Sequence, residues 1–515
     1  MRQIKRFFCL ALALALLCAM PLAPRAQGPN LTTANVSNYP VLNFHGGFHE
    51  LYINENYEEC VFDPAWIGGL AAARLDDLLE KMKSLDINGA TDILKEVMWE
   101  WFGPIQMDGK GVSKNEDITG NQNNWNPEYR TPSFDTDWRL SPIENAEKLH
   151  RYLEDVCDNY GVEKFNLRPI SGTIPIVLAY LDEHGYDRVA SLHIDITTHN
   201  GSTIFGELFA RRMVVDVEAL SKLEKIDGIV SFDLTALSSV LRWLFEPGVL
   251  SVVERFLKLA ATRLIDRVYD EVVIPLLSTI PGLWTFVPAK DFETAKRVLL
   301  GRNPDADLVA KLNAWQDIAL RADDILREAA GQVKVGVWAG YGTPLAPLGN
   351  SKGTNSDFMV DTKYASLGAT CAPLDLPFLP GYRQKNTKCG HSHISPDRMI
   401  DASTCLLPEQ TWFALNKQHG SELSYSGWHD WFLVTDKPNV HGNERYPQFM
   451  EAVQCYDSGY DEENDWHWEW RWYEYYPLEK SEGDTLLLVM KTIGLHLLKI
   501  WRWLLLLPLF WVSWL

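Results

Sequence analysis

The chain has 515 residues, which suffices for one large domain with insertions or for two smaller domains. Hydrophobic residues make up 46% of the chain and charged residues 23%, so most of it is expected to be globular. The formal net charge of −20 argues against a nucleic-acid-binding protein, whose surface has to be basic to meet the phosphates.

The first 26 residues are organised like a secretory signal peptide. Arg2, Lys5 and Arg6 form a basic start, and an apolar run over residues 7–22 leads to small residues and prolines. This pattern predicts export and cleavage near Ala26, with an uncleaved anchor helix as the alternative. Six cysteines then remain, and an even number in an exported chain permits disulfide bonds without fixing their pairing.

Residues 28–204 alternate between strand and helix patterns. The predicted elements are a strand at 41–44, a helix beginning near Pro142, a strand at 164–168, a helix at 172–184 and a strand at 189–197. Proline suits the first helical turn, where its missing N–H costs nothing. This alternation predicts a mostly parallel sheet with helices on both faces, the first part of an α/β core.

Residues 205–330 show long apolar helical patterns that no strand pattern interrupts. An all-helical insertion between the strands of such a sheet is predicted to be a cap or lid, and its Leu, Val and Phe content suits contact with acyl chains. A second helical core domain is the alternative. The α/β core resumes over residues 331–456, with predicted strands at 333–341 and 411–415.

The segment 457–484 is acidic and rich in tryptophan. Its alternating residues are Trp466, Trp468, Trp470 and Trp472. A period of two places all four on one face of a strand. That face is expected either to pack on the core or to offer an aromatic surface to sugar or lipid.

The last segment, residues 485–515, predicts an apolar helix that associates with a membrane surface. Lys491, Lys499 and Arg502 fall on one side of it, and the uncharged run that follows has only 13 residues. Spanning a bilayer takes about 20 apolar residues. A helix lying in the membrane interface is therefore predicted, with a snorkelling transmembrane anchor as the alternative.

A serine lies between a strand and a helix in FNLRPISGTIPIVLAYLDEHGYDRVASL, residues 165–192. A serine nucleophile needs such a strained turn, a histidine base, an orienting acid and two backbone N–H donors. Ser171 has this place, and the N–H of Gly172 would be one donor. The flanking glycines of a G-x-S-x-G turn are replaced by Pro169 and Thr173. A helix N-cap is the other interpretation of Ser171.

Several stretches resemble the lecithin:cholesterol acyltransferase-like lipases, in that family's order from about residue 39 to 420. YPVLNFHGGF is similar to the oxyanion strand PVVFVHG, and FDTDWRLSP to the signature YDWRLSP. VEKFNLRPISGT is similar to KVNLIGHSMGG, and HIDITTHNGST to IGTPHNGS. NSDFMVDTKYAS resembles the acid loop NDGVV…S, and QTWFALNKQHG resembles the stretch that carries the family's histidine.

This resemblance implies an α/β-hydrolase fold and lipase, esterase or O-acyltransferase chemistry on lipid or other carboxylic esters, without a cofactor. It implies that Ser171 is the nucleophile, Asp357 the acid and His419 the base, with the N–H groups of Gly47 and Gly172 as the oxyanion hole. The altered turn and the change of Asp-Gly to Asp-Phe in the acid loop motivate an alternative. This is a catalytically impaired relative that binds lipid or cell-envelope material.

Other residues could take parts of this chemistry. Asp361, four residues after Asp357, is the alternative acid, and His391 and His393 are alternative bases. The two histidines could also suggest a metal, but they lack a clear carboxylate or cysteine partner set. Because C-x-x-C and zinc-type spacings are absent, no structural metal is predicted.

Three further polar positions are predicted to be structural. His45 and His199 are expected to support the site without reacting. Asp137 and Arg139 are expected to form an ion pair under the sheet.

Overall fold

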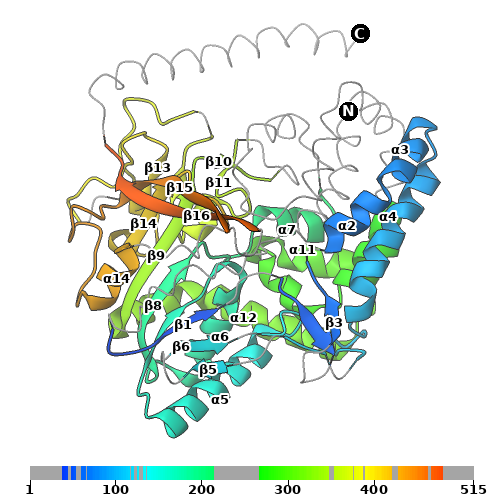
Figure 1. Ribbon diagram of the computed structural model, residues 1–515, viewed down its shortest axis with the longest axis horizontal. Helices are drawn as coiled ribbons and strands as arrows, with labels where there is room; N and C mark the ends of the chain where they lie inside the picture. Colours follow the sequence, from blue (N-terminus) through cyan, green and yellow to red (C-terminus); the bar gives the residue numbers. More distant parts are fainter. Residues whose placement is uncertain are drawn as a thin grey trace, which may run out of the picture.

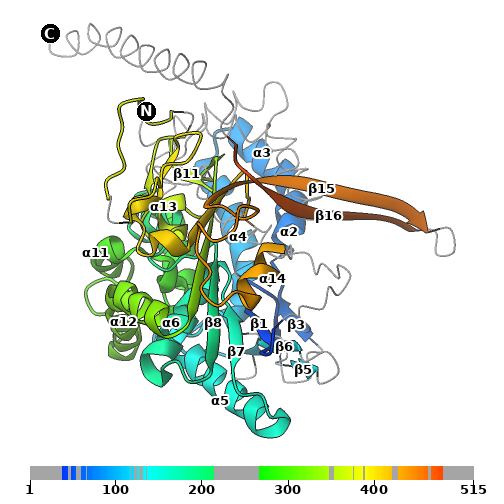
Figure 2. The ribbon, with the colours of Figure 1, turned by 90° about the vertical axis from the view of Figure 1, so that its left-hand side faces the viewer.

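A computed structural model describes residues 37–479, apart from 45–47, 54–58, 65, 116–117, 121–123, 127–130, 135, 214–265, 347–352, 375, 387–388, 420–426 and 462–465. A twisted sheet of nine strands runs through the body, and helices lie on both of its sides (Figures 1 and 2). The sheet is mostly parallel, which confirms the predicted α/β class.

Seven neighbouring strands of the sheet are parallel, and one antiparallel strand lies at each edge. In spatial order the strands are β16 (Trp466–Pro477), β15 (Phe449–Asp461), β14 (Thr411–Leu415), β9 (Lys334–Tyr341), β8 (Val189–Asp195), β7 (Phe165–Arg168), β1 (Val41–Phe44), β6 (Thr131–Phe134) and β5 (Asn124–Asn126). The central strands are almost wholly buried, as expected for parallel strands covered on both faces.

The strand order reverses between β1 and β7. The chain passes from β1 to β6 on one side, crosses over through α5 (Pro142–Tyr160), and then adds β7, β8, β9 and β14 outward on the other side. In sheets of this kind, the carboxyl ends of the two strands at such a reversal border a crevice where ligands bind. Ser171 follows the carboxyl end of β7.

Helices α5, α6 (Ile174–His184) and α12 (Ala306–Gln332) pack side by side along one face of the sheet (Figure 2). The sequence predicts the start of α5 correctly, because Ser141 and Glu144 form a capping box and Pro142 follows. The α5 helix ends at Gly161, which has a left-handed backbone.

A second apolar cluster covers the opposite face near β9 and β14. Helix α14 (Gly427–Val434) places Trp428 and Phe432 against Trp338 and Trp412 of these two strands. Large rings dominate here, so this face is closed by aromatic packing.

The region predicted to be an all-helical lid is described only in part. The described elements are α7 (Thr203–Phe209), the π-helical η6 (Tyr269–Leu277), η7 (Pro281–Phe286), α11 (Ala289–Leu299) and α12. The α12 helix leads directly into β9 and packs against α6, so it belongs to the layered core. Residues 214–265, which belong to the predicted lid, lie outside the described residues.

The predicted tryptophan-rich strand is β16, and it pairs with β15 along its whole length from Met450↔Pro477 to Asp461↔Trp466. The base of this hairpin is attached to the sheet where β15 pairs with β14. The rest projects well beyond the body of the molecule (Figure 2).

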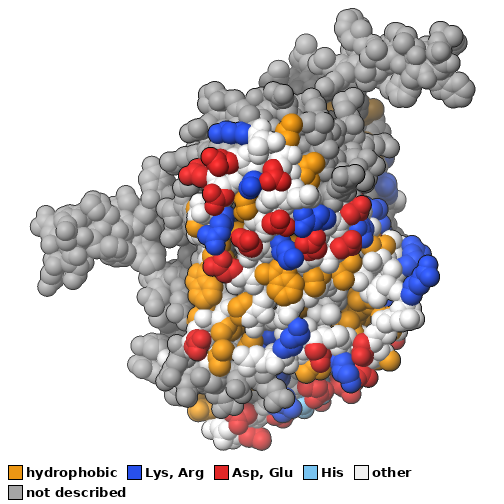
Figure 3. All heavy atoms as spheres, turned by 90° about the vertical axis from the view of Figure 1, so that its right-hand side faces the viewer, with side chains coloured by type: hydrophobic (Ala, Val, Ile, Leu, Met, Phe, Trp, Pro, Cys, Tyr) orange, Lys and Arg blue, Asp and Glu red, His pale blue; other side chains and the backbone are white. Residues whose placement is uncertain are grey.

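The remaining elements lie outside the nine-stranded sheet. They are β2 (Leu51–Ile53), β3 (Glu59–Phe62), β4 (Ile118–Thr119), β10 (Thr343–Pro344), β11 (Asn355–Ser356), β12 (Thr370–Cys371), β13 (Ile400–Asp401), α2 (Trp66–Ala73), α3 (Leu75–Lys83), α4 (Ile87–Phe102), α13 (Thr362–Ala365), η3 (Gly103–Ile105), η4 (Ser171–Thr173), η8 (Ala402–Thr404) and η9 (Pro408–Gln410). On the face that carries α3 and α4, acidic and basic side chains are interspersed (Figure 3). Arg267, for example, contacts Asp92 of α4 and Glu271.

Candidate active site

Ser171 lies on a sharp turn between β7 and α6. Its φ angle of +52° is in the left-handed region that residues other than glycine rarely adopt. The serine carbonyl accepts hydrogen bonds from the backbone N–H and the hydroxyl of Thr198, both at 3.3 Å. Ser171 therefore has a strained backbone conformation just after β7. The hydrogen bonds from Thr198, in the loop after β8, hold it in place.

The two residues that replace glycines around Ser171 fit this turn. The Thr173 hydroxyl donates to the Ile170 carbonyl at 2.8 Å and accepts from the Ile170 N–H at 2.9 Å. The Pro169 carbonyl accepts the N–H of Asp195 at 3.1 Å. At the two positions where a G-x-S-x-G turn has glycines, this turn is therefore held by the hydroxyl hydrogen bonds of Thr173 and by the backbone hydrogen bond of Pro169.

The serine hydroxyl contacts an imidazole that a carboxylate holds. Ser171 Oγ lies 3.0 Å from His419 Nε2, and His419 Nδ1 lies 2.9 Å from Asp357 Oδ2. All three residues are buried. With Asp357 accepting from Nδ1–H, the Nε2 lone pair faces the hydroxyl and can take its proton.

Asp357 is itself fixed in place. Its Oδ1 accepts hydrogen bonds from the N–H groups of Met359 at 3.0 Å and Val360 at 2.7 Å, and its carbonyl accepts the N–H of His419 at 2.9 Å. The structure therefore brings together the three residues proposed as nucleophile, base and acid. Their catalytic roles remain a prediction.

The alternative acid, Asp361, faces another residue. Its two carboxylate oxygens accept hydrogen bonds from the N–H and the hydroxyl of Thr203, at 2.9 and 2.6 Å. Burial raises the pKa of Asp361, and the bonds from Thr203 oppose that rise in pKa. Asp361 thus ties the short helix α13 to the start of α7, and Asp357 is the carboxylate that contacts the imidazole.

The alternative bases also lie elsewhere. His393 contacts Gln448 and Cys389, and the His391 ring stacks on His441 with centroids 3.8 Å apart. His199, predicted to be structural, lies 3.5 Å from Asp323 of α12. His45 falls outside the described residues.

Only one of the two proposed oxyanion donors can be placed. Gly172 directly follows Ser171, and a Cβ atom there would collide with the Phe286 ring. Phe286 stacks on Phe205, with centroids 4.7 Å apart, and lies 6.0 Å from Phe48. The turn therefore faces an apolar wall of phenylalanines. Gly47 lies outside the described residues.

Asp137 and Arg139 form a buried ion pair. The guanidinium donates to both carboxylate oxygens, at 2.9 and 2.6 Å, and also to the Ile105 carbonyl and the Ser113 hydroxyl. Through these four hydrogen bonds, the pair fastens the segment before α5 to the segment after α4. The ion pair itself is as the sequence predicts.

The sequence did not predict a cluster of buried charged side chains behind the turn. Arg168 lies 2.9 Å from Asp195, and Lys417 lies 3.6 Å from the same carboxylate. Close by are His193 and His429, whose ring nitrogens have no hydrogen-bond partner among the described residues. The signal for this cluster in the sequence was a charged residue at the end of an apolar strand, as in FNLR.

The six cysteines of the predicted mature chain are all unpaired. They are Cys60, Cys157, Cys371, Cys389, Cys405 and Cys455.

In the described part of the chain, no helix has both the length and the apolar character needed to cross a membrane. The predicted signal peptide and the predicted membrane helix at 485–515 lie outside it.

Comparison with known proteins leaves the motif resemblance without independent support. The chain matches no protein-family model and no curated protein.

Proposed function

We propose that this protein is a serine hydrolase that acts on lipid or other carboxylic esters through an acyl-enzyme intermediate. The observation that carries the proposal is the relay of 3.0 and 2.9 Å from the Ser171 hydroxyl through His419 to Asp357. The strained serine after a parallel strand and its place at the reversal of strand order support the same chemistry.

In the proposed reaction, His419 accepts the hydroxyl proton while Ser171 Oγ attacks the ester carbonyl. The N–H of Gly172, together with that of Gly47, stabilises the oxyanion. The protonated imidazole, held by Asp357, then donates its proton to the leaving alcohol. Water, or a second alcohol in an O-acyltransferase, attacks the acyl-enzyme by the same steps in reverse.

The proposed substrate is apolar on its acyl side. Phe48, Phe205 and Phe286 lie together beside the turn, and a polar acyl group would gain nothing from these rings. The sequence patterns at the two ends of the chain suit an exported protein held at a membrane surface. A lipid ester satisfies both considerations.

The test is labelling of the folded protein with a fluorophosphonate probe, which reacts with activated serines. We expect wild-type protein and a Ser84→Ala control to be labelled equally, because Ser84 is exposed at the end of α3. Ser171→Ala should lose the label, and its ester hydrolysis should fall by about 10⁴-fold or more.

Two outcomes would count against the proposal. Labelling that persists in Ser171→Ala would mean that another residue reacts. Folded wild-type protein that takes no label and hydrolyses no ester would favour the alternative, a lipid-binding relative without activity.

A further inference from the structure

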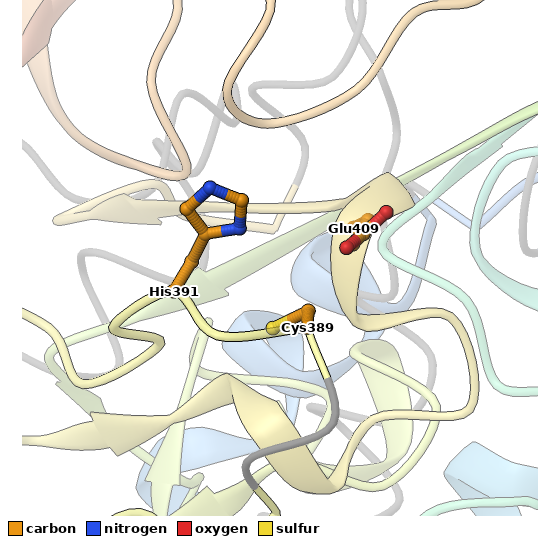
Figure 4. A group of neighbouring side chains, drawn as sticks. All are labelled: Cys389, His391 and Glu409. Carbon is orange, nitrogen blue, oxygen red and sulfur yellow. The ribbon is translucent and has the colours of Figure 1, made fainter.

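Three side chains of types that can bind metal ions, from two separate segments, meet beside the start of β14 (Figure 4). Cys389 and His391 belong to one loop, and Glu409 to the short helix η9. The thiol, an imidazole nitrogen and a carboxylate oxygen all lie within 4.8 Å of one another. The carboxylate arrives from 18 residues after His391, so local spacing could not reveal it.

A second histidine, His393, contacts one member of this group, Cys389. His393 Nε2 lies 2.7 Å from Cys389 Sγ, and His393 Nδ1 lies 2.6 Å from Gln448 Oε1. The Gln448 amide nitrogen donates to the carbonyls of Pro408 and Thr411, at 2.7 and 3.1 Å, which fixes the amide oxygen toward His393. The proton of His393 is therefore on Nδ1, and the Nε2 lone pair faces the sulfur.

Histidines that coordinate metal ions in proteins commonly have this hydrogen-bonding arrangement. One ring nitrogen donates to an oxygen, which sets the tautomer and the ring plane, and the other nitrogen remains free to coordinate. His393 is fully buried, so its orientation does not depend on solvent. Cys389 is half-buried and His391 exposed, which leaves an entry path from solvent.

We propose that Cys389, His391, His393 and Glu409 form a zinc-binding site. A set of one sulfur, two imidazole nitrogens and one carboxylate oxygen suits tetrahedral Zn²⁺, with bonds of about 2.0 to 2.3 Å. Binding draws the donors inward and releases the proton of the Cys389 thiol to solvent. Gly390, with φ +76°, gives the loop the freedom for that adjustment.

The position of the site indicates a structural role. Glu409 precedes β14 and His419 follows it, so the two ends of a five-residue strand, about 17 Å, separate the proposed zinc from the serine turn. The ion would fasten the loop that carries Cys389 to the sheet. This inference is independent of the proposed hydrolase activity.

The test uses the full chain, stripped with a chelator and titrated with Zn²⁺ or Co²⁺ alone. We expect one ion per chain, a rise in Tm of at least about 2 °C, and a cobalt–thiolate charge-transfer band. Cys389→Ser should abolish the band, and Glu409→Gln should weaken binding by about 10-fold or more. His441→Phe, which keeps the ring stacked on His391, is the control and should bind like wild type.

Several results would overturn the proposal. One is wild-type protein that binds neither ion. Another is a charge-transfer band that survives Cys389→Ser, because the thiolate would then come from another cysteine. A third is unchanged affinity in Glu409→Gln, a variant that keeps the size of the side chain on the surface helix η9.

Discussion

At the scale of single residues, the turn at Ser171 forms without flanking glycines because neighbouring residues hold its backbone. A non-glycine residue at positive φ costs about 1 to 3 kcal/mol, which the surrounding contacts have to offset. Thr198 bonds the Ser171 carbonyl twice, and Thr173 bonds both backbone groups of Ile170. The strain that Ser171 carries is therefore balanced by hydroxyl groups from two threonines.

The two candidate acids can be separated by matched substitutions. In Asp357→Asn, the amide oxygen can keep the bonds from Met359 and Val360 while its NH₂ faces His419 Nδ1. The imidazole must then carry its proton on Nε2, and we expect the rate of ester hydrolysis to fall about 10⁴-fold with the fold intact.

Asp361→Asn is the control for that measurement. Its carboxylate bonds only Thr203 in the contacts described above, so hydrolysis should stay within a few-fold of wild type. Equal losses in the two variants would show that Asp357 has no special role.

The buried pair His193 and His429 predicts a pH dependence of stability. Burial, followed by neighbouring charge, holds the pKa of both imidazoles well below the usual 6.5. Folded protein keeps them neutral while unfolded chain protonates them, so stability is full above pH 6.5 and is lost as the pH falls.

Below that pH, each histidine should lower the free energy of unfolding by about 1 kcal/mol per pH unit. His429→Leu should remove close to half of this slope, which urea unfolding of both proteins at several pH values would measure. An identical slope in the variant would mean that His429 is protonated in the folded state.

At the scale of elements, β9 determines how closely the acid and base loops approach. A Cβ on Gly340 would collide with the Lys417 carbonyl and lie 2.8 Å from the Asp357 Cβ. Gly340→Ala should therefore push apart the loops that carry Asp357 and His419. We expect a loss of about 1 to 3 kcal/mol in stability, together with a large fall in kcat.

Gly336→Ala in the same strand is the matched variant. Its new Cβ would meet the rings of Phe432 and Trp428, on the same face of β9 but nearer the amino end of the strand than Gly340. It should cost comparable stability, measured by thermal unfolding, and leave kcat nearly unchanged. A normal kcat in Gly340→Ala would show that the loop approach tolerates displacement.

The sequence predicted the elements whose signals are local. Apolar runs located β1, β7, β8, β9 and β14 to within two residues, and Ser-Pro located the start of α5. It did not reveal that α12 belongs to the core, because its packing partner α6 lies more than a hundred residues away. The same limit hid the approach of Glu409 to Cys389 and His391.

At the scale of the whole molecule, the described body ends at residue 479 and the predicted membrane helix comes after it. If that segment holds the protein at a membrane, a protein truncated after residue 484 should be found in the soluble fraction, whereas the full chain pellets with membranes. Core packing should be unaffected, and thermal unfolding checks this. A truncated protein that still pellets with vesicles would place the attachment elsewhere.

The contact between Ser171 and His419 joins residues 248 positions apart. Closing a loop of that length costs about 5 kcal/mol of chain entropy, and contacts between residues close in the sequence do not offset this cost. The Ser171–His419 contact can therefore assemble only after several crossovers of the parallel sheet are in place, a topology that folds slowly. Newly made chains would pass through a long interval in which helices exist but the hydroxyl has no base, so the proposed chemistry would begin only at the end of folding.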